Sequence, residues 1–420
     1  MPSILAATRR LVPVIILMVP GAALISGCGS SSHSSPLPSV SSPGVDAIVG
    51  QKPLLRGLAA TGASDGTSVT VALYRGTKAS GTPMRLVTAA RRDGVWAVRV
   101  ALVPGSYAIR ARQQRAHGLA RGPVRTFTVS ADPVVGAAGD IACDPASTSF
   151  HAGNGSRSGA RCQARATSDL LLGADLAGVL AVGDLQYESA QAPAFALSFG
   201  PSWGRLGRLI HPALGNHEYV PPRPTVAYFD YFNGLRHPSG VAGPRPTGWY
   251  SFDLGNWHLI ALNSNCSYIG GCGKDSPEVR WLEADLAAHP VRCTLAYWHH
   301  PRWSSGSHGD QGQMSRIWKT LVAAKADVVI SGHDHDYERF APQDGDGKRD
   351  DSAGIREFVV GTGGKNHDPF TRLPADANSE VRDSQAFGVL ELALHQSSYD
   401  WRFVPVAGGS FSDSGSQSCH

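Results

Sequence analysis

Residues 178–187 read GVLAVGDLQY, a short apolar run that ends abruptly in polar residues. The first five residues have the length and composition of a strand buried on both faces of a sheet. Gly183 allows a sharp turn directly after the strand, and Asp184 follows at its carboxyl end. In open α/β sheets, ligands bind at that edge. The stretch therefore predicts an α/β sheet with a ligand site at the carboxyl ends of its strands.

Four other segments of the chain have the same form, an apolar run followed by Asp, Asn or His. The polar residues that follow these four runs are Asp140, Asn216, His217, Glu218, His299, His300, His333 and His335. Each segment alone is a weak signal, because an Asp after a strand is most often a helix cap and a His-x-His pair is often a surface feature. Five such segments in one chain are not expected by coincidence, so together they indicate one shared site.

Amphipathic helices are predicted between the apolar runs. In residues 276–286, Ser276 is suited to cap a helix and Pro277 to its first turn, while apolar residues recur on one face. Buried strands that alternate with such helices indicate an α/β domain, which we place at residues 132–420.

Residues 45–131 follow a different pattern, with apolar and polar residues alternating at a period of two. Val69, Val71 and Leu73 form one such run, and turn signals such as Asp93-Gly94 separate it from the others. This pattern predicts an antiparallel β-sandwich, and its last hairpin resembles that of a bacterial immunoglobulin-like module. The region carries no cluster of reactive side chains, so we interpret it as a spacer or docking domain.

The first residues read as a processing signal. Residues 1–28 hold a short basic region, an apolar run and then small residues, which is the order of a signal peptide. Their last four residues, ISGC, resemble the bacterial lipobox, in which Cys28 becomes the lipid-carrying residue; the alternative is a plain secretory peptide cut nearby. Residues 29–44 are rich in Ser and Pro, which predicts a flexible spacer from the membrane.

Charge and composition exclude some functions. The chain has 420 residues with 42% hydrophobic and 17% charged residues, which is typical of a globular protein. The formal net charge of +4 comes from scattered basic residues, so a nucleic-acid partner is disfavoured.

The seven cysteines fit an oxidising compartment outside the cytoplasm. If Cys28 carries lipid, six remain, and six cysteines allow 15 pairings. Proximity along the chain favours Cys143–Cys162 and Cys266–Cys272, which leaves Cys293 for Cys419, but the residues alone leave the connectivity open.

The ordered set GD…GDxxY…GNHE…HxP…GHxH resembles the metallophosphoesterase (calcineurin-like phosphoesterase) superfamily, and the Tyr three residues after the second Asp resembles its purple acid phosphatase branch. The resemblance runs from about Val134 to the C-terminus and implies a layered α/β sandwich with mixed sheets. It also implies a two-metal site. The positions that match the family's metal ligands are Asp140, Asp184, Tyr187 and His335 for one metal, and Asn216, His299 and His333 with a bridging Asp184 for the second.

The side chains themselves agree with this metal assignment. Carboxylate, imidazole, amide and phenolate donors suit Fe, Mn or Zn better than metals that prefer thiolates. Many members of the superfamily carry a His two residues after the first Asp, where this chain has Ala142, and Tyr187 is placed to replace it. A phenolate favours a trivalent ion, so the resemblance implies Fe(III) with a divalent Zn, Fe or Mn.

The resemblance implies hydrolysis of a phosphate ester by a metal-bound hydroxide, with Asp184 bridging the metals. His217 is expected to donate to a phosphate oxygen or to the leaving group. His308 matches a second phosphate-contacting histidine, and its alternative is a solvated loop residue. Glu218 and Asp334 are expected to orient histidines.

We therefore expect an exported enzyme, an acid phosphatase-like hydrolase of phosphate monoesters anchored to the membrane through Cys28, or otherwise secreted. One alternative is a phosphodiesterase acting on nucleotides or lipid head groups with the same metals. A second alternative is a non-enzymatic surface protein with a degenerate enzyme domain, although every ligand position is filled. Natural substrate and oligomeric state stay open.

Overall fold

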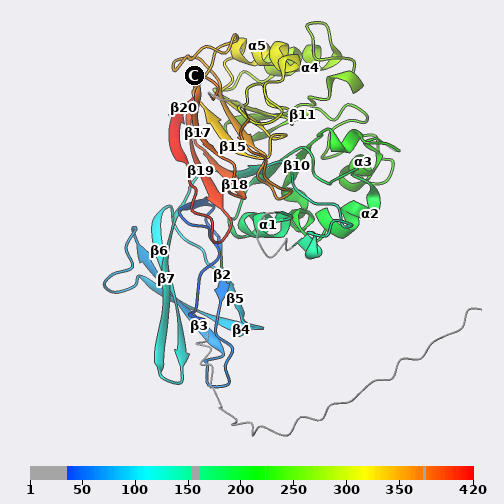
Figure 1. Ribbon diagram of the computed structural model, residues 1–420. Helices are drawn as coiled ribbons and strands as arrows, with labels where there is room; N and C mark the ends of the chain where they lie inside the picture. Colours follow the sequence, from blue (N-terminus) through cyan, green and yellow to red (C-terminus); the bar gives the residue numbers. More distant parts are fainter. Residues whose placement is uncertain (1–35, 154–160, 223, 372–374) are drawn as a thin grey trace, which may run out of the picture. The chain divides into compact units, whose positions relative to one another are not determined.

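The computed structural model describes residues 36–153, 161–222, 224–371 and 375–420 (Figure 1). The expected signal peptide, residues 1–28, and its lipobox lie outside these residues. Among the helices in the described ranges, none has the length and apolar character needed to cross a bilayer.

Seven strands account for most of the N-terminal region. They are β1 Ala47–Val49, β2 Leu54–Leu58, β3 Ser68–Arg75, β4 Arg85–Arg92, β5 Val95–Arg99, β6 Gly105–Arg115 and β7 Gly118–Val129. They pair in the order β1-β7-β6-β3-β4-β5-β2, and only the short β1–β7 pair is parallel. Val69 and Val71 of β3 are fully buried, as the period of two requires. The region is thus built from strands as expected, and its immunoglobulin-like classification stays a prediction.

The expected flexible spacer is wrong for its described part, residues 36–44. Ser41 N donates to the carbonyl oxygen of Arg56 (2.8 Å), and Arg56 N donates to that of Ser42 (3.0 Å). Val40 is only 3% exposed. The segment covers β2, the last strand of the sheet, whose free backbone groups would otherwise lack partners.

Two mixed sheets form the second region. One has the order β10-β9-β8-β18-β19-β20 and the other β11-β12-β13-β14-β16-β15-β17. The strands of the first sheet are β8 Val134–Ala138, β9 Gly178–Val182, β10 Ile210–Ala213, β18 Gly388–Leu394, β19 Ser398–Pro405 and β20 Ser414–Ser418. Those of the second sheet are β11 Tyr250–Leu254, β12 Trp257–Ala261, β13 Cys293–Tyr297, β14 Val328–Ser331, β15 Tyr337–Phe340, β16 Arg356–Val360 and β17 Ser379–Asp383. The strand predicted at residues 178–182 is β9, and the four other polar segments follow β8, β10, β13 and β14.

Alternate residues of the second sheet face different layers. In β13, Leu295 belongs to the large core shared with the first sheet, while Ala296 packs into a separate core with residues of the helices α4 and α5. The helices are α1 Ala164–Gly173, α2 Ala192–Ala194, α3 Val226–Asn233, α4 Pro277–Ala288 and α5 Ser315–Ala323 (Figure 1). The two sheets therefore pack face to face with helices outside them, which confirms the layered α/β sandwich with mixed sheets.

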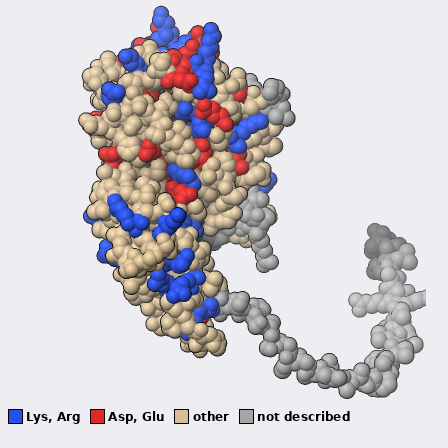
Figure 2. Space-filling model, turned by 90° about the vertical axis from the view of Figure 1, so that its left-hand side faces the viewer, with Lys and Arg blue, Asp and Glu red and all other residues tan. Residues whose placement is uncertain are grey.

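The predicted helix cap and the predicted disulfide pairs are also present. Ser276 Oγ accepts a hydrogen bond from Val279 N (3.3 Å) at the start of α4, with Pro277 in its first turn. The three disulfides favoured by proximity are present: Cys143–Cys162, Cys266–Cys272 and Cys293–Cys419. On the face drawn in Figure 2, basic and acidic side chains are mixed in the upper part of the view, whereas the charged side chains of the lower part are mostly basic.

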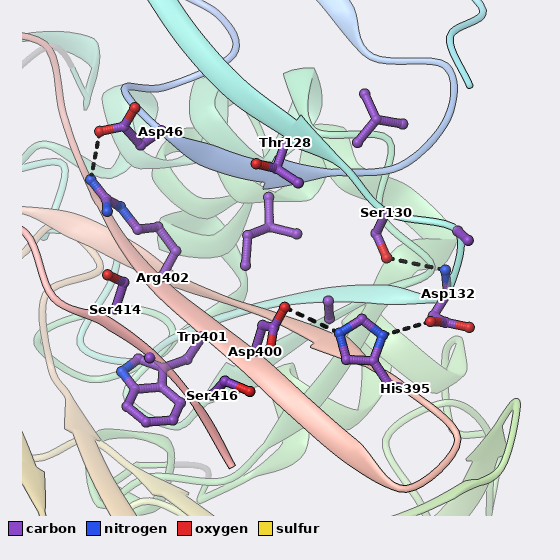
Figure 3. A pocket seen from close by; sticks show the side chains of 15 residues that line it. Asp46, Thr128, Ser130, Asp132, His395, Asp400, Trp401, Arg402, Ser414 and Ser416 are labelled. Atoms are coloured by element: carbon purple, nitrogen blue, oxygen red, sulfur yellow. Dashed lines mark hydrogen bonds and ion pairs between the residues drawn. The ribbon is translucent and has the colours of Figure 1, made fainter. Parts of the chain in front are cut away.

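A pocket of about 560 Å³ lies where β1 and the chain after β7 meet the strands β18 to β20 (Figure 3). Along its wall, His395 lies between Asp132 (2.6 Å) and Asp400 (3.2 Å). Nearby, the fully buried Glu391 accepts a hydrogen bond from Ile48 N (2.7 Å). Polar contacts thus join the first region of the chain to the sheet of the second.

Candidate metal centre

The predicted site residues lie at neighbouring strand ends. Asp140, Asp184 and Asn216 follow β8, β9 and β10, which are adjacent parallel strands of one sheet. His299 and His333 follow β13 and β14, which are adjacent parallel strands of the other sheet. Because the carboxyl ends of parallel strands meet at the same edge, the five loops converge there.

One cluster of donor atoms forms around Tyr187. Its hydroxyl lies 2.7 Å from Asp140 Oδ1 and 2.9 Å from His335 Nε2. Asp140 Oδ1 and His335 Nε2 are 3.2 Å apart. Asp140 is fully buried and Tyr187 is 2% exposed. A carboxylate, a phenol and an imidazole therefore share one small, buried volume.

A second cluster forms around His299 Nε2. Asn216 Oδ1 lies 3.0 Å from it, His333 Nδ1 3.2 Å and Asp184 Oδ2 3.3 Å. Asp184 also interacts with Tyr187 of the first cluster. Asp184 thus lies between the two donor sets and joins them.

The ring nitrogens turned away from the clusters are held by acceptors. His299 Nδ1 lies 3.1 Å from the carbonyl oxygen of Val182, and His335 Nδ1 lies 3.1 Å from Asn366 Oδ1. A carbonyl oxygen only accepts, so each Nδ1 carries a hydrogen, and Nε2 is the nitrogen that faces the cluster and can bind a metal once it has lost its proton. No sequence motif pointed to Val182 or Asn366 as partners of these histidines.

Backbone geometry explains the glycines beside the ligand positions. A Cβ at Gly215 would lie 2.2 Å from Asp184 Oδ1, and one at Gly332 would lie 2.6 Å from Asp140 Oδ2. His333 itself has a φ of 71°, a left-handed conformation that is uncommon for His. The loops therefore pass directly against the carboxylates, and the backbone bears strain where the polar groups converge.

Charge in the site is concentrated and buried. Burial raises the pKa of Asp184, but His299 and His217 outweigh it and hold that pKa far below its usual range. Burial works to lower the pKa of His299 and of His335, yet the carboxylates beside them raise both values to about 9. Burial and Asp140 raise the pKa of the Tyr187 hydroxyl. The site thus attracts positive charge strongly, and its oxygen and nitrogen donors fit Fe, Mn or Zn.

Glu218 acts on the backbone and not on a histidine, so this part of the prediction is wrong. Its carboxylate accepts from the N–H groups of Asp184 (3.0 Å), Leu185 (2.9 Å), Gln186 (3.4 Å) and Gly215 (2.8 Å). The loop after β9 and the loop after β10 both lie within its reach, so one side chain holds both in place. Burial and the charge of Asp184 raise its pKa to about 7.

Asp334 does orient a histidine, as expected. Its Oδ1 accepts from His308 N (2.8 Å) and lies 3.0 Å from His308 Nδ1, while Oδ2 accepts from Ser304 Oγ (2.6 Å). This contact is the main reason why the pKa of His308 is raised. The side chain of His308 is 44% exposed, so its outer edge is open to solvent.

His217 contacts both Asp184 and Tyr187. Its backbone N donates to Asp184 Oδ1 (2.9 Å), and its Nδ1 donates to the carbonyl oxygen of Glu188 (2.5 Å). Its ring packs on that of Tyr187, with centroids 4.2 Å apart. The structure thus brings His217 beside the centre, and it places His308 against His333 with centroids 4.3 Å apart.

Sequence reasoning did not identify Lys365 as a neighbour of the centre. Its Nζ lies 4.4 Å from the centroid of the Tyr187 ring and pairs with Glu188. Its backbone carbonyl accepts from Cys162 N (3.0 Å), so the Cys143–Cys162 disulfide loop supports it. Lys365 lies in no recognised motif, so only the fold could reveal it.

Residues 162–337 match the family model of the calcineurin-like phosphoesterases. This chain therefore carries a calcineurin-like phosphoesterase domain, and its relatives are purple acid phosphatases. It is 28% identical to purple acid phosphatase 23 of Arabidopsis thaliana over 204 residues, which is 41% of this chain and 44% of the relative. It is 30% identical to Fe(3+)-Zn(2+) purple acid phosphatase 12 of the same plant over 181 residues, 38% of this chain and 36% of the relative.

A solved purple acid phosphatase, PPD1 from yellow lupin (Lupinus luteus) seeds, shares the fold. Its TM-score is 0.53 at 17% sequence identity, over 92% of this chain and 75% of that one. The matched part of the chain spans about half the length of the curated relatives, with 44%, 52% and 53% covered in three of them. The predicted family resemblance is confirmed.

Proposed function

We propose that this protein is an exported dinuclear-metal phosphoesterase that hydrolyses phosphate monoesters, in the manner of an acid phosphatase. The observation that carries the proposal is the pair of donor clusters joined by Asp184. Around Tyr187 the donor atoms lie 2.7 to 3.2 Å apart, and around His299 they lie within 3.3 Å of its Nε2. Buried carboxylates and histidines grouped this closely favour a cation between them, which would replace the protons that the histidines otherwise hold.

The donor chemistry assigns a different ion to each cluster. Asp140, Tyr187 and His335 with Asp184 would hold Fe(III), since phenolate and carboxylate oxygens favour a trivalent ion. Asn216, His299 and His333 with Asp184 would hold a divalent Zn, Fe or Mn. When bound, two such ions lower the pKa of a water and neutralise phosphate oxygens.

His217 and His308 would bind the phosphate group from two sides. Each uses Nδ1 for a fixed partner, Glu188 O or Asp334, and Nε2 would contact the substrate; that of His217 lies 3.8 Å from Asp184 Oδ2, beside the proposed bridging ligand. In its protonated form Nε2 donates to a phosphate oxygen or to the leaving oxygen. Both side chains are partly exposed, at 24% and 44%, so a substrate can reach them.

The cysteines support export. Three disulfides in one chain are expected outside the reducing cytoplasm. With the signal-like residues 1–28, they favour a protein on the outer side of the membrane, held there by lipid on Cys28.

The proposal is tested with purified protein loaded with Fe(III) and Zn, assayed on p-nitrophenyl phosphate and on bis-p-nitrophenyl phosphate. Metal content and the visible spectrum are recorded on the same samples. We expect two metals per chain, a tyrosinate-to-iron absorption band and turnover of the monoester. Turnover of the diester alone would replace the monoesterase by a phosphodiesterase. A folded protein that binds no metal would overturn the enzyme proposal and favour a degenerate domain.

A further inference from the structure

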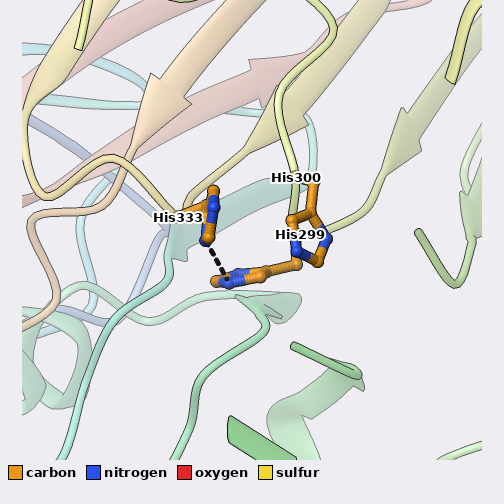
Figure 4. Close-up of side chains that lie close together, drawn as sticks. All are labelled: His299, His300 and His333. Atoms are coloured by element: carbon orange, nitrogen blue, oxygen red, sulfur yellow. Dashed lines mark hydrogen bonds between the residues drawn. The ribbon is translucent and has the colours of Figure 1, made fainter. Parts of the chain in front are cut away.

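Beside the second donor cluster lies a histidine with no role in the proposed centre. His300 directly follows His299, and its ring lies close to those of His299 and His333, with centroids 4.9 and 4.4 Å away (Figure 4). One ring nitrogen from each of the three lies within 4.8 Å of the others. His300 is 9% exposed, so it is packed in place and not a solvated loop residue.

Ser264 fixes which nitrogen of His300 carries the hydrogen. The Ser264 hydroxyl accepts from His300 N (3.0 Å) and lies 2.7 Å from His300 Nδ1. Among the described residues, His300 Nδ1 is the acceptor available to the hydrogen of the Ser264 hydroxyl. Nδ1 is thus the accepting nitrogen, and the ring hydrogen sits on Nε2 as a donor. Nε2 has no hydrogen-bond partner in the described part of the chain.

His300 is not needed as a metal ligand. Asp184, Asn216, His299 and His333 already offer four donor atoms to the second cluster. Because Nε2 carries its hydrogen, it has no lone pair to give to a metal. The N–H group at Nε2 has no hydrogen-bond partner within the described ranges and belongs to a side chain that lies next to the proposed ligands. An oxygen atom bound at the second cluster would accept a hydrogen bond from it.

We infer that His300, held by Ser264, is a third phosphate-contacting histidine, which donates from Nε2 to a phosphoryl oxygen bound at the second cluster. This inference rests on the proposed phosphoesterase function and deepens it. The ligand class is a phosphate monoester or the inorganic phosphate that its hydrolysis releases. His308 also packs against His333, with ring centroids 4.3 Å apart, so both histidines lie beside the same metal-ligand position.

The test compares His300→Ala, His300→Gln and Ser264→Ala with the unaltered protein, all loaded with the same metals. Binding of inorganic phosphate is measured by calorimetry, and kcat and KM on p-nitrophenyl phosphate are measured separately. His300→Ala should weaken phosphate binding about 10- to 100-fold, because a hydrogen bond to a charged oxygen is lost. His300→Gln keeps an N–H donor and should recover most of the affinity, while Ser264→Ala should weaken binding by a smaller factor.

The exposed His117 in the turn between β6 and β7 supplies the control, and His117→Ala should match the unaltered protein. Two metals per chain should remain in every variant. Loss of one metal in His300→Ala would make His300 a ligand and overturn the inference, as would unchanged phosphate affinity. Phosphate binding is read without turnover, so an inactive protein that binds phosphate refutes the proposed activity alone. If His300→Ala fails to fold, His300→Gln and Ser264→Ala decide the question.

Discussion

Glu218 offers the sharpest test of how the centre is held together. Each carboxylate oxygen of Glu218 accepts hydrogen bonds from two backbone N–H groups. The variant Glu218→Gln replaces one oxygen by an NH₂ group, which cannot accept from the two N–H groups that it faces. On the Oε2 side these are the donors of Asp184 (3.0 Å) and Gly215 (2.8 Å), and on the Oε1 side those of Leu185 (2.9 Å) and Gln186 (3.4 Å). Whichever way the amide turns, two buried donors lose their acceptor.

Each buried donor left without a partner destabilises a protein by about 1–3 kcal/mol, so the variant should lose about 2–6 kcal/mol. Relief of the repulsion between Glu218 and Asp184 offsets part of this loss. A domain is typically stable by about 5–15 kcal/mol, so the variant should fold but unfold at clearly lower urea concentration.

Urea unfolding is followed on the metal-free protein at pH 8, above the Glu218 pKa of about 7, so that the carboxylate is ionised. The matched control is Glu283→Gln, which removes an exposed ion pair with Arg316 and should change stability by less than about 1 kcal/mol. Metal content of the two variants is compared after loading, and Glu218→Gln should retain less because the loops of Asp184 and Asn216 loosen together. Unfolding within about 1 kcal/mol of the unaltered protein would refute the role assigned to these four hydrogen bonds.

Three further changes test other parts of the structure. Tyr187→Phe removes a donor of the first cluster, so the iron-loaded variant should lack a tyrosinate absorption band; a band that persists would assign it to another residue. Asp334→Asn weakens the contact that raises the pKa of His308, so the alkaline limb of the pH–rate profile should move to lower pH, and an unmoved limb would contradict this role. Burial raises the pKa of Glu391 to about 8, so the folded protein keeps a proton that the unfolded chain releases and stability falls as pH rises from about 4.5 to 8. Glu391→Gln should therefore make the unfolding free energy less dependent on pH, by about 1.4 kcal/mol per pH unit in that window. The measurement is urea unfolding of both proteins at pH 5.5 and 7.5. The same pH dependence in the variant and the unaltered protein would show that Glu391 is ionised when buried.

Much of the candidate site was open to prediction because its residues follow strands directly. Asp140, Asp184 and His333 each come one or two residues after a buried apolar run. An apolar run is recognisable locally, and parallel pairing then brings the ends of such strands to one edge. Strand ends thus indicated a shared site, and the resemblance of the ordered motifs to the metallophosphoesterases then supplied the seven proposed ligands as a set.

Other parts could not be predicted in this way. The four hydrogen bonds to Glu218 come from two different loops, and a carboxylate beside a histidine gives no local sign that it accepts from the backbone. Residues 36–44 were misjudged because their composition is that of a linker, while their packing depends on the free edge of β2. Composition indicates how a segment behaves in isolation, but it does not show which strand edge the segment pairs with in the folded protein.

The sequence by itself determined the strands and the α4 cap, since these depend on periodicity and turn chemistry, and its motifs supplied the candidate ligands through their resemblance to a known family. Only the tertiary structure decided which nitrogen of each histidine is free, because that depends on an acceptor far along the chain. Val182 O for His299 is 117 residues away, and Ser264 for His300 is 36 residues away. Hydrogen-bond partners act over about 3 Å in space, whatever their distance in sequence, and folding alone brings them together.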